Sequence, residues 1–491
     1  MRTLGLAPWT RVVGTRCRVF TWACTANRSN ASLRVSVDVE WVRMSMSLTS
    51  EPIPLLTRRI AIPASVGFFF NTMYNFVDTY CAGLISTDAL AALSLSFPVF
   101  FILLSAGSGL SQGTTALMAN AIGAKDEEGA RRLFAQALTF ATVAGVGLSI
   151  VGGFAAPSLF RLLGAEGEYL RVALAYMNVI LCGGVFFILQ MAINAALNAQ
   201  GDTKLYRNFL IAGFVANCAL NPILMWGWFG LPAMGVGGIA LATVIVQAAG
   251  CVMLWRGVRR RPLFAELPRS YFQPDLQLLR RILGQATPAA LNMLTVALGI
   301  FVITWFVKHF GKEAVAAYGI ATRIEQVILL PTIGLNFAVL GLVGQNHGAG
   351  LPHRVREAWM TCVKYGAGLM VGGGVVLYFL RGSAMQLFTQ DSSVVEHGGD
   401  YLGIAAITLA AYPMLFVTVF MLQGLKRPAY GLWIGLYRQI AAPMLIFNGL
   451  AFTLGYGLWG VWWGIGLVTW SAAVLTLWWG WQVVGKLVQQ R

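Results

Sequence analysis

Twelve long apolar stretches follow one another from residue 60 to residue 482, separated by short polar connectors. Each holds about the twenty residues that a helix needs to cross a bilayer. Several are longer, which allows a helix to tilt or to extend beyond the lipid. The pattern predicts an all-α, polytopic membrane protein with twelve transmembrane helices, at residues 60–85, 89–121, 133–156, 169–198, 209–230, 236–255, 284–307, 314–345, 358–380, 398–422, 431–453 and 459–482.

The composition agrees with this prediction. Hydrophobic residues make up 57% of the 491 residues and charged residues only 11%, which is more apolar surface than one soluble core can hide. The net charge of +16 raises the question of nucleic acid, but the basic residues are spread over the short connectors, where they set membrane topology. We therefore expect the lipid bilayer, and no nucleic acid, as a partner.

Lysine and arginine are divided unequally between the two sides that alternating helices imply. One side carries most of them, including seven arginines between Arg256 and Arg281. The other side carries Arg161, Arg171, Lys308, Lys312 and Arg381. Because cytoplasmic connectors are enriched in Lys and Arg, the richer side is predicted to be cytoplasmic, with both termini inside, in an inner (plasma) membrane protein.

The residue types that carry enzymatic or metal chemistry form no familiar set. The seven cysteines, at positions 17, 24, 81, 182, 218, 251 and 362, and the four histidines, at positions 309, 347, 353 and 397, show no metal-ligand or disulfide spacing. No nucleophile elbow, P-loop, Rossmann fingerprint or HExxH motif occurs. We expect no enzyme, no catalytic residue and no cofactor, and the sequence argues against ATP-driven transport by this chain alone.

Residues 1–50 differ from the rest, being basic and without a long apolar run. Their Arg- and Ser-rich composition resembles a targeting peptide. The interpretation that we favour is a disordered tail or an extension upstream of the true start, with Met44 or Met46 as initiator, and we assign the segment no function.

A constant offset of 225 residues relates two parts of the chain. It brings Pro63-Ala64 onto Pro288-Ala289, Gly109-Leu110 onto Gly334-Leu335, and Gly123-Ala124 onto Gly348-Ala349. Transporters are often built from such repeats. We predict two pseudo-symmetric six-helix lobes, residues 51–255 and 284–491, joined by a cytoplasmic linker at 256–283. Because each lobe has six helices, an even number, both lobes have the same orientation in the membrane and are related by an axis along the membrane normal. This symmetry predicts a cavity between the two lobes.

One carboxylate, Asp78, interrupts the first apolar stretch. With Asn71 and Asn75 it stands at i, i+4 and i+7, so the three form one polar stripe on a helix. Intramembrane acids are usually paired, face a cavity and mark an ion or substrate path. The alternative is an interfacial aspartate, because Asp78 lies about one hydrocarbon thickness from Arg59. The stripe reaches well inside the span, so we favour the functional interpretation.

Polar stripes also mark the fourth, fifth and sixth stretches. Asparagine, glutamine and threonine can serve simply as glue between membrane helices. Taken together, the stripes are better explained as the lining of one cavity in the first lobe. Their members are Gln190, Asn194 and Asn198; Asn217 and Asn221; and Thr243 and Gln247.

Asp78 among neutral amides suits two roles. Without a cation nearby, such a carboxylate can take up a proton; ringed by oxygen ligands, it can hold a small cation instead. Both are roles of a coupling ion. In the second lobe Arg323 and Glu325 also lie within a span, two residues apart, so they do not face each other on a straight helix. They are either cavity-lining or structural.

Eight segments, in order along the chain, resemble the multidrug and toxic compound extrusion (MATE) family, in its DNA-damage-inducible-protein-F-like branch. The resemblance covers about residue 51 to the end. The segments are IPASVGFFFNTMYNFVDTYCAG (62–83), LAALSLSFPV (90–99), GLSQGTTALMANAIGA (109–124), ALNAQGDTK (196–204), NCALNPILMWG (217–227), GVGGIALATVI (235–245), AYGIATRIEQ (317–326) and GLVGQNHGAG (341–350).

The resemblance implies an alternating-access antiporter that exports small, often cationic or amphipathic compounds in exchange for protons or sodium. It also implies an ion site on Asp78, Asn217, Asn221 and Thr243, which would also hold sodium. The family pattern expects aspartate where this chain has Asn221. Hard cations prefer charged oxygen ligands, so this departure favours proton coupling over sodium.

We expect a monomer that exports a small-molecule substrate. The alternative is a flippase for lipid-linked or polysaccharide precursors, of the same superfamily shape, which would need a larger and more basic groove. A polytopic membrane enzyme would need a clustered nucleophile or metal set.

Overall fold

The computed structural model describes residues 48–490, and every regular element in that range is a helix. The predicted N-terminal extension lies, up to residue 47, outside the described residues. The helices are α2 (Ile53–Ile85), α3 (Thr87–Gly123), α4 (Glu127–Leu162), α5 (Gly167–Cys182), α6 (Gly184–Ala199), α7 (Lys204–Trp226), α8 (Val236–Arg259), α9 (Pro262–Ala265), α10 (Leu276–Val307), α11 (Lys312–Gly348), α12 (Pro352–Gln386), α13 (Ser392–Thr408), α14 (Ala411–Gly424), α15 (Ala429–Leu436), α16 (Ala442–Phe447) and α17 (Gly457–Gln489). Short helices η1 (Trp228–Gly230), η2 (Arg269–Phe272) and η3 (Lys308–Phe310), and the π-helices η4 (Tyr437–Ala441) and η5 (Asn448–Thr453), complete the set.

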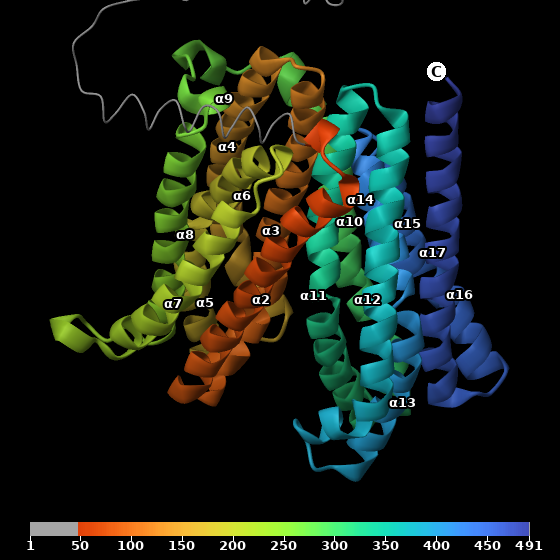
Figure 1. Cartoon of the computed structure of the whole chain (residues 1–491). Helices are drawn as coiled ribbons and strands as arrows, with labels where there is room; N and C mark the ends of the chain where they lie inside the picture. Colours follow the sequence, from red (N-terminus) through yellow and green to blue (C-terminus); the bar gives the residue numbers. More distant parts are fainter. Residues whose placement is uncertain (1–47, 491) are drawn as a thin grey trace, which may run out of the picture.

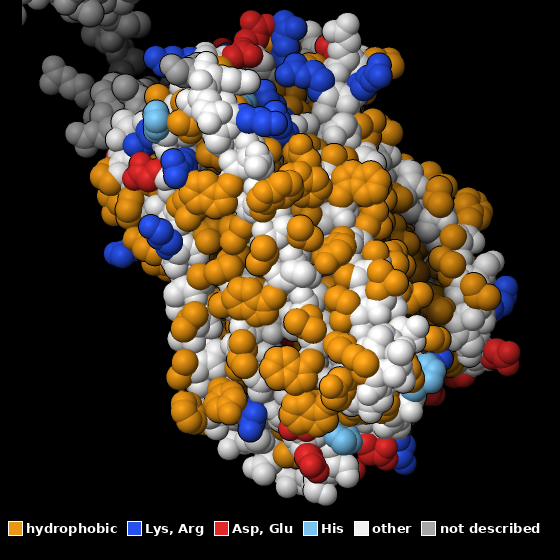
Figure 2. Space-filling view, turned by 90° about the vertical axis from the view of Figure 1, so that its right-hand side faces the viewer, with side chains coloured by type: hydrophobic (Ala, Val, Ile, Leu, Met, Phe, Trp, Pro, Cys, Tyr) orange, Lys and Arg blue, Asp and Glu red, His pale blue; other side chains and the backbone are white. Residues whose placement is uncertain are grey.

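The all-helical membrane architecture is confirmed. In the described range, nine helices are long and apolar enough to cross a membrane. Two further predicted spans are broken pairs: α5 and α6 meet at 44°, and α13 and α14 at 53°. The predicted span at 431–453 consists of α15, η4, α16 and η5, because two π-helical segments interrupt it. Figure 2 shows the apolar side chains as a broad belt, with Lys and Arg gathered at the upper end.

Four helices of the described range, α3, α4, α10 and α13, begin at a capping side chain. The side chain of Ser86 accepts a hydrogen bond from Ala89 N at the start of α3, and Asp126 accepts one from Gly129 N at the start of α4. Asp275 and Asp391 cap α10 and α13 in the same way. Each such cap satisfies a backbone N–H that the helix itself leaves free.

The chain forms two groups of helices, α2 to α8 (the first half) and α10 to α17 (the second half). Figure 1 shows them side by side, diverging toward the lower end of the view. Helices α2 and α3 pack against α10 and α11 where the two halves meet. The connections from α3 to α4 and from α11 to α12 lie at the upper end.

The contacts between the halves repeat at the offset of 225. The side-chain amide of Asn120 donates to the carbonyl oxygen of Gly424 at 2.8 Å, and that of Gln345 donates to Ala199 O at 2.7 Å. At the same offset Asn120 corresponds to Gln345, and Ala199 to Gly424. The two hydrogen bonds are therefore pseudo-symmetric partners. They hold the upper end of one half against the other.

Glycines allow the two backbones to touch there. A Cβ atom at Gly109 would lie 2.6 Å from Ala286 O, and one at Gly334 would lie 2.3 Å from Ala61 O. These two contacts are again related by the offset of 225. The sequence repeat thus corresponds to a close packing surface that is shared by both halves. The domain boundaries at 255 and 284 stay a prediction.

We predict that Gly109→Ala weakens this packing. The added methyl group meets backbone atoms that cannot move alone, so we expect a loss of about 1–3 kcal/mol of stability. Gly147→Ala is the matched control, because nothing lies within 4 Å of a Cβ at that helical position. The midpoint of thermal unfolding in detergent measures both, and equal midpoints for the two variants would contradict the account.

Candidate functional site

Asp78 points from α2 into the first half and is only 6% exposed. Its Oδ1 atom accepts hydrogen bonds from the side-chain amides of Asn217, at 2.9 Å, and Asn221, at 2.8 Å. Its Oδ2 atom accepts one from the hydroxyl of Thr243 at 3.2 Å. The structure therefore brings together all four residues that the sequence predicted for the ion site. Their role stays a prediction.

The two asparagines reach Asp78 together because they stand one turn apart on α7, directly before Pro222. Both are fully buried. Their amides also meet each other: Asn221 Nδ2 lies 3.2 Å from Asn217 Oδ1. In this orientation, assigned from the hydrogen-bond network, the amide nitrogens face the carboxylate and the amide oxygens face away from it.

Thr243 completes the site from α8. Its hydroxyl oxygen lies 3.2 Å from Asp78 Oδ2 and 3.2 Å from the backbone oxygen of Ile239, one turn earlier. A hydroxyl has one hydrogen to donate. Thr243 therefore has two acceptors for one hydrogen and can serve either.

No lysine, arginine or histidine in the described part of the chain forms an ion pair with Asp78. The buried Tyr74, one turn before it on α2, has a hydroxyl with no hydrogen-bond partner among the described residues. Three neutral hydrogen-bond donors thus compensate the desolvation of the buried carboxylate. The arrangement can hold a charged carboxylate without a counter-ion.

Asn71 and Asn75 do not join this cluster. Asn75 is exposed and donates to the backbone oxygen of Asn71 at 3.0 Å. On the same side of α2, Phe68 stacks on Phe337 of α11, with ring centroids 5.4 Å apart. Because Asn75 stands seven residues after Phe68, it lies on the face of α2 that turns toward the second half.

Amide groups on two helices, α6 and α8, contribute further buried polar atoms to the first half. Asn194 Oδ1, Gln190 Oε1 and Gln247 Oε1 have no hydrogen-bond partner among the described residues. Asn194 is 5% exposed and Gln190 is 3% exposed. Buried oxygens of this kind are rare unless water or a ligand satisfies them.

In the second half, Glu325 and Arg323 lie on different faces of α11. Arg323 is exposed, while Glu325 is 5% exposed and accepts a hydrogen bond from the Tyr401 hydroxyl at 2.6 Å. The ring of Tyr412 is also close to Glu325. The guanidinium of Arg438, on η4, lies 5.3 Å from the Tyr412 ring centroid. The sequence reasoning missed these partners because they come from three distant segments.

Among residues 48–490, no three His, Cys, Asp or Glu side chains gather as metal ligands do.

Comparison with known proteins decides the family. The MatE family model matches residues 63–223 and 288–454, one match in each half. The chain belongs to the MATE family. It is therefore a multi-pass membrane protein and a secondary active transporter, not an enzyme.

Relatives and solved structures agree with this membership. The probable multidrug resistance protein YoeA of Bacillus subtilis is 30% identical over 401 residues, which is 74% of this chain and 86% of the relative. An FAD transporter of Shewanella oneidensis is 27% identical over 400 residues, covering 80% of this chain and 87% of the relative. A MOP superfamily transporter from Pyrococcus furiosus has a TM-score of 0.84 at 25% identity, covering 90% of this chain and 98% of that chain. The predicted MATE fold is thus confirmed.

We predict that Tyr401→Phe destabilises this MATE protein. The substitution leaves the buried Glu325 without its short hydrogen bond, at a cost of about 1–3 kcal/mol. The matched control is Tyr80→Phe, since Tyr80 is 61% exposed. Thermal unfolding in detergent provides the measurement, and a midpoint for Tyr401→Phe as high as that of Tyr80→Phe would be the opposing result.

Proposed function

We propose that this MATE transporter exports small organic, cationic or amphipathic compounds in exchange for protons that bind Asp78. The observation that carries the proposal is the hydrogen-bond set around that carboxylate. Asn217, Asn221 and Thr243 all donate to it, and the Thr243 hydroxyl has a second acceptor within reach.

The set fits both protonation states of Asp78 without a large rearrangement. When Asp78 is ionised, Thr243 donates to its Oδ2 atom. When a proton is bound on Oδ2, the carboxylic acid donates to the Thr243 hydroxyl, which donates in turn to Ile239 O. In both protonation states, every hydrogen-bond donor near Oδ2 has an acceptor. Neither state therefore carries the free-energy cost of an unsatisfied buried group.

Protonation changes how firmly α2 is held to α7. Hydrogen bonds to an ionised group are roughly twice as strong as those between neutral groups. A proton on Asp78 therefore weakens the two amide bonds that tie α2 to α7. The same α2 contacts the second half, where the Ser65 hydroxyl lies 3.3 Å from Pro331 O. Binding of the proton can thus bias one arrangement of the two halves over another.

Proton coupling is favoured over sodium by the side chains present. Sodium, as a hard cation, prefers charged oxygen ligands. Asp78 is the site's one carboxylate, and the amide nitrogens of Asn217 and Asn221, rather than their oxygens, face it. Sodium would need both amides to turn over and break these bonds.

The substrate is proposed to occupy the space between and within the halves. Asn75 faces the second half, and the unpartnered oxygens of Gln190, Asn194 and Gln247 can accept hydrogen bonds from a cationic or polar compound. Relatives carry the names multidrug resistance protein and multidrug export protein. These names support a drug-like substrate, while a place in the DNA-damage-inducible-protein-F-like branch is proposed from the resemblance of the eight sequence segments alone.

The orientation follows from the basic residues. We propose that the upper end in Figure 1, where Lys and Arg gather in Figure 2, faces the cytoplasm, with both termini inside. The halves touch at that end and diverge at the other, so this arrangement faces outward. The transporter is proposed to act as a monomer in the plasma membrane, with lobes 51–255 and 284–491 joined by 256–283.

We predict that Asp78→Asn abolishes ion-driven export while leaving expression unchanged. Asparagine keeps the shape of the side chain but cannot exchange a proton. Dye export from proteoliposomes with an imposed pH gradient, or an imposed sodium gradient, is the measurement. The control is Asp88→Asn, which removes an exposed acid at the start of α3. Export retained by Asp78→Asn would count against the proposal.

We further predict that Asn221→Asp adds a response to sodium. It places a second carboxylate next to Asp78 and gives the site the charged oxygens that sodium prefers. The wild type should respond to a pH gradient alone, and the variant also to a sodium gradient. The control, Asn75→Asp, adds the same charge one turn from Asp78 without contacting it. Its export should not respond to a sodium gradient. A sodium response already present in the wild type would overturn the proton assignment.

A further inference from the structure

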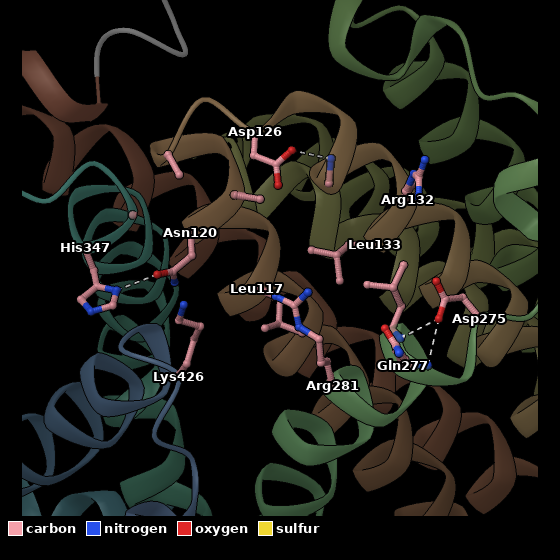
Figure 3. A pocket seen from close by; sticks show the side chains of 15 residues that line it. Leu117, Asn120, Asp126, Arg132, Leu133, Asp275, Gln277, Arg281, His347 and Lys426 are labelled. Atoms are coloured by element: carbon pink, nitrogen blue, oxygen red, sulfur yellow. Dashed lines mark hydrogen bonds between the residues drawn. The ribbon is translucent and has the colours of Figure 1, made fainter.

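A cavity of about 430 Å³ lies at the upper end of the molecule, between the two halves. Its first-half wall comes from α3 and α4, and its second-half wall from α10, α11 and the residues after α14 (Figure 3). The polar and charged side chains that line it are Asn120, Asp126, Arg132, Asp275, Gln277, Arg281, His347 and Lys426. Leucines at positions 117, 133 and 278 provide an apolar floor.

The pseudo-symmetric counterpart of this cavity is filled by the chain itself. In the second half, Asn346 donates to the backbone oxygen of Leu48 at 3.0 Å, and Arg354 donates to the backbone oxygen of Glu51 at 2.7 Å. Leu48 is fully buried. The second half thus uses an amide and a guanidinium to bind oxygen atoms at this place.

The first half has small residues at the matching positions. At the offset of 225, Ala121 corresponds to Asn346 and Gly129 to Arg354, and both small residues line the cavity. The long side chains of Asn346 and Arg354 therefore have no counterpart in the first half, where Ala121 and Gly129 border the cavity instead. A ligand rather than the chain can occupy it.

Two cations of the second half extend into this space. Figure 3 shows Arg281 directed toward Leu117 and Lys426 directed toward Asn120. Neither forms an ion pair within residues 48–490. A guanidinium and an ammonium that converge on one space suit a phosphate group, which guanidinium binds through paired hydrogen bonds and ammonium as a point charge.

The remaining charges of the cavity are already engaged. Arg132 pairs with Glu128 at 2.6 Å. Asp126 Oδ1 accepts from Gly129 N, and Asp275 Oδ1 accepts from Gln277 N, so each carboxylate lies at a helix N-terminus that compensates its charge. In Figure 3, Asp126 and Arg132 lie on the α4 side of the cavity, and Asp275 lies beside Gln277 at the start of α10.

We propose that this cavity binds a phosphate group, from a phospholipid headgroup or from a soluble phosphate, through Arg281 and Lys426. The bound group lies beside the contact in which His347 Nδ1 meets Asn120 Oδ1 at 2.7 Å, across the two halves. Because its ligands belong to the second half and its walls to both, it stabilises the arrangement that is closed at this end. The proposal is independent of the ion that Asp78 carries.

Thermal unfolding of the full-length protein in detergent tests this proposal. Phosphatidylglycerol, phosphatidylcholine and inorganic phosphate, the last against chloride at equal ionic strength, are titrated separately. We expect phosphatidylglycerol to raise the unfolding midpoint more than phosphatidylcholine does, or inorganic phosphate to raise it more than chloride does. A shift with the lipid alone identifies a headgroup ligand, a shift with phosphate alone a soluble one, and shifts with both a site open to either source.

The double variant Arg281→Gln/Lys426→Gln should need about tenfold more of the effective ligand for the same shift, because it loses charge-assisted contacts. Arg269→Gln/Lys364→Gln removes the same charge from exposed positions outside the cavity and should behave as wild type. Ala121→Phe, which fills the cavity and keeps its charges, should also lose the shift. The proposal is overturned if no phosphate compound shifts the midpoint, or if the cavity and control variants respond equally.

Discussion

A buried carboxylate that is balanced by three neutral hydrogen-bond donors is the interaction on which the proposed mechanism depends. Asp78 has no cation beside it, so two amides and a hydroxyl must compensate the loss of water. This requirement fixes the rotation of α2, α7 and α8 about their axes. It also makes the helices sensitive to a single proton, since the strength of the bonds depends on the charge of the carboxylate.

The second constraint is the contact between the halves. Paired amide bonds from Asn120 and Gln345, and glycines at which backbones touch, close one end of the molecule in a pseudo-symmetric way. Packed interfaces can adopt discrete alternative arrangements, so changes in the position of α2 can favour a different one. Asp78 and the closed end share α2, which is the link between proton and movement in the proposed mechanism.

Much of this architecture could be predicted from the sequence because lipid imposes a simple rule. Apolar stretches of about twenty residues marked the spans, and the offset of 225 marked the repeat. The pattern did not reveal the breaks: Gly183, between α5 and α6, lies within one predicted span, and the π-helices at Tyr437–Ala441 and Asn448–Thr453 lie within another. Local backbone geometry leaves no mark on average hydropathy.

The candidate site could likewise be predicted only in part from the sequence. The i, i+4 spacing of Asn217 and Asn221 predicted that they share a face, and the polar stripes predicted one cavity in the first lobe, but only the resemblance singled out Asp78, Asn217, Asn221 and Thr243 as an ion site. Asn71 and Asn75 were predicted to line the cavity, which stays a prediction; Asn75 donates to the backbone of Asn71 and does not contact the carboxylate. The tyrosines around Glu325 could not be predicted, because contacts between distant segments follow from packing and not from sequence period.

The most direct measurement is infrared difference spectroscopy of the purified protein as the pH is lowered. The account predicts a band from a protonated, buried carboxylic acid that is absent in Asp78→Asn. The band should be retained in Thr243→Ser and altered in frequency in Thr243→Val, because only the hydroxyl can accept the acid's hydrogen. A spectrum of Asp78→Asn identical to that of the wild type would contradict the claim that Asp78 carries the coupling proton.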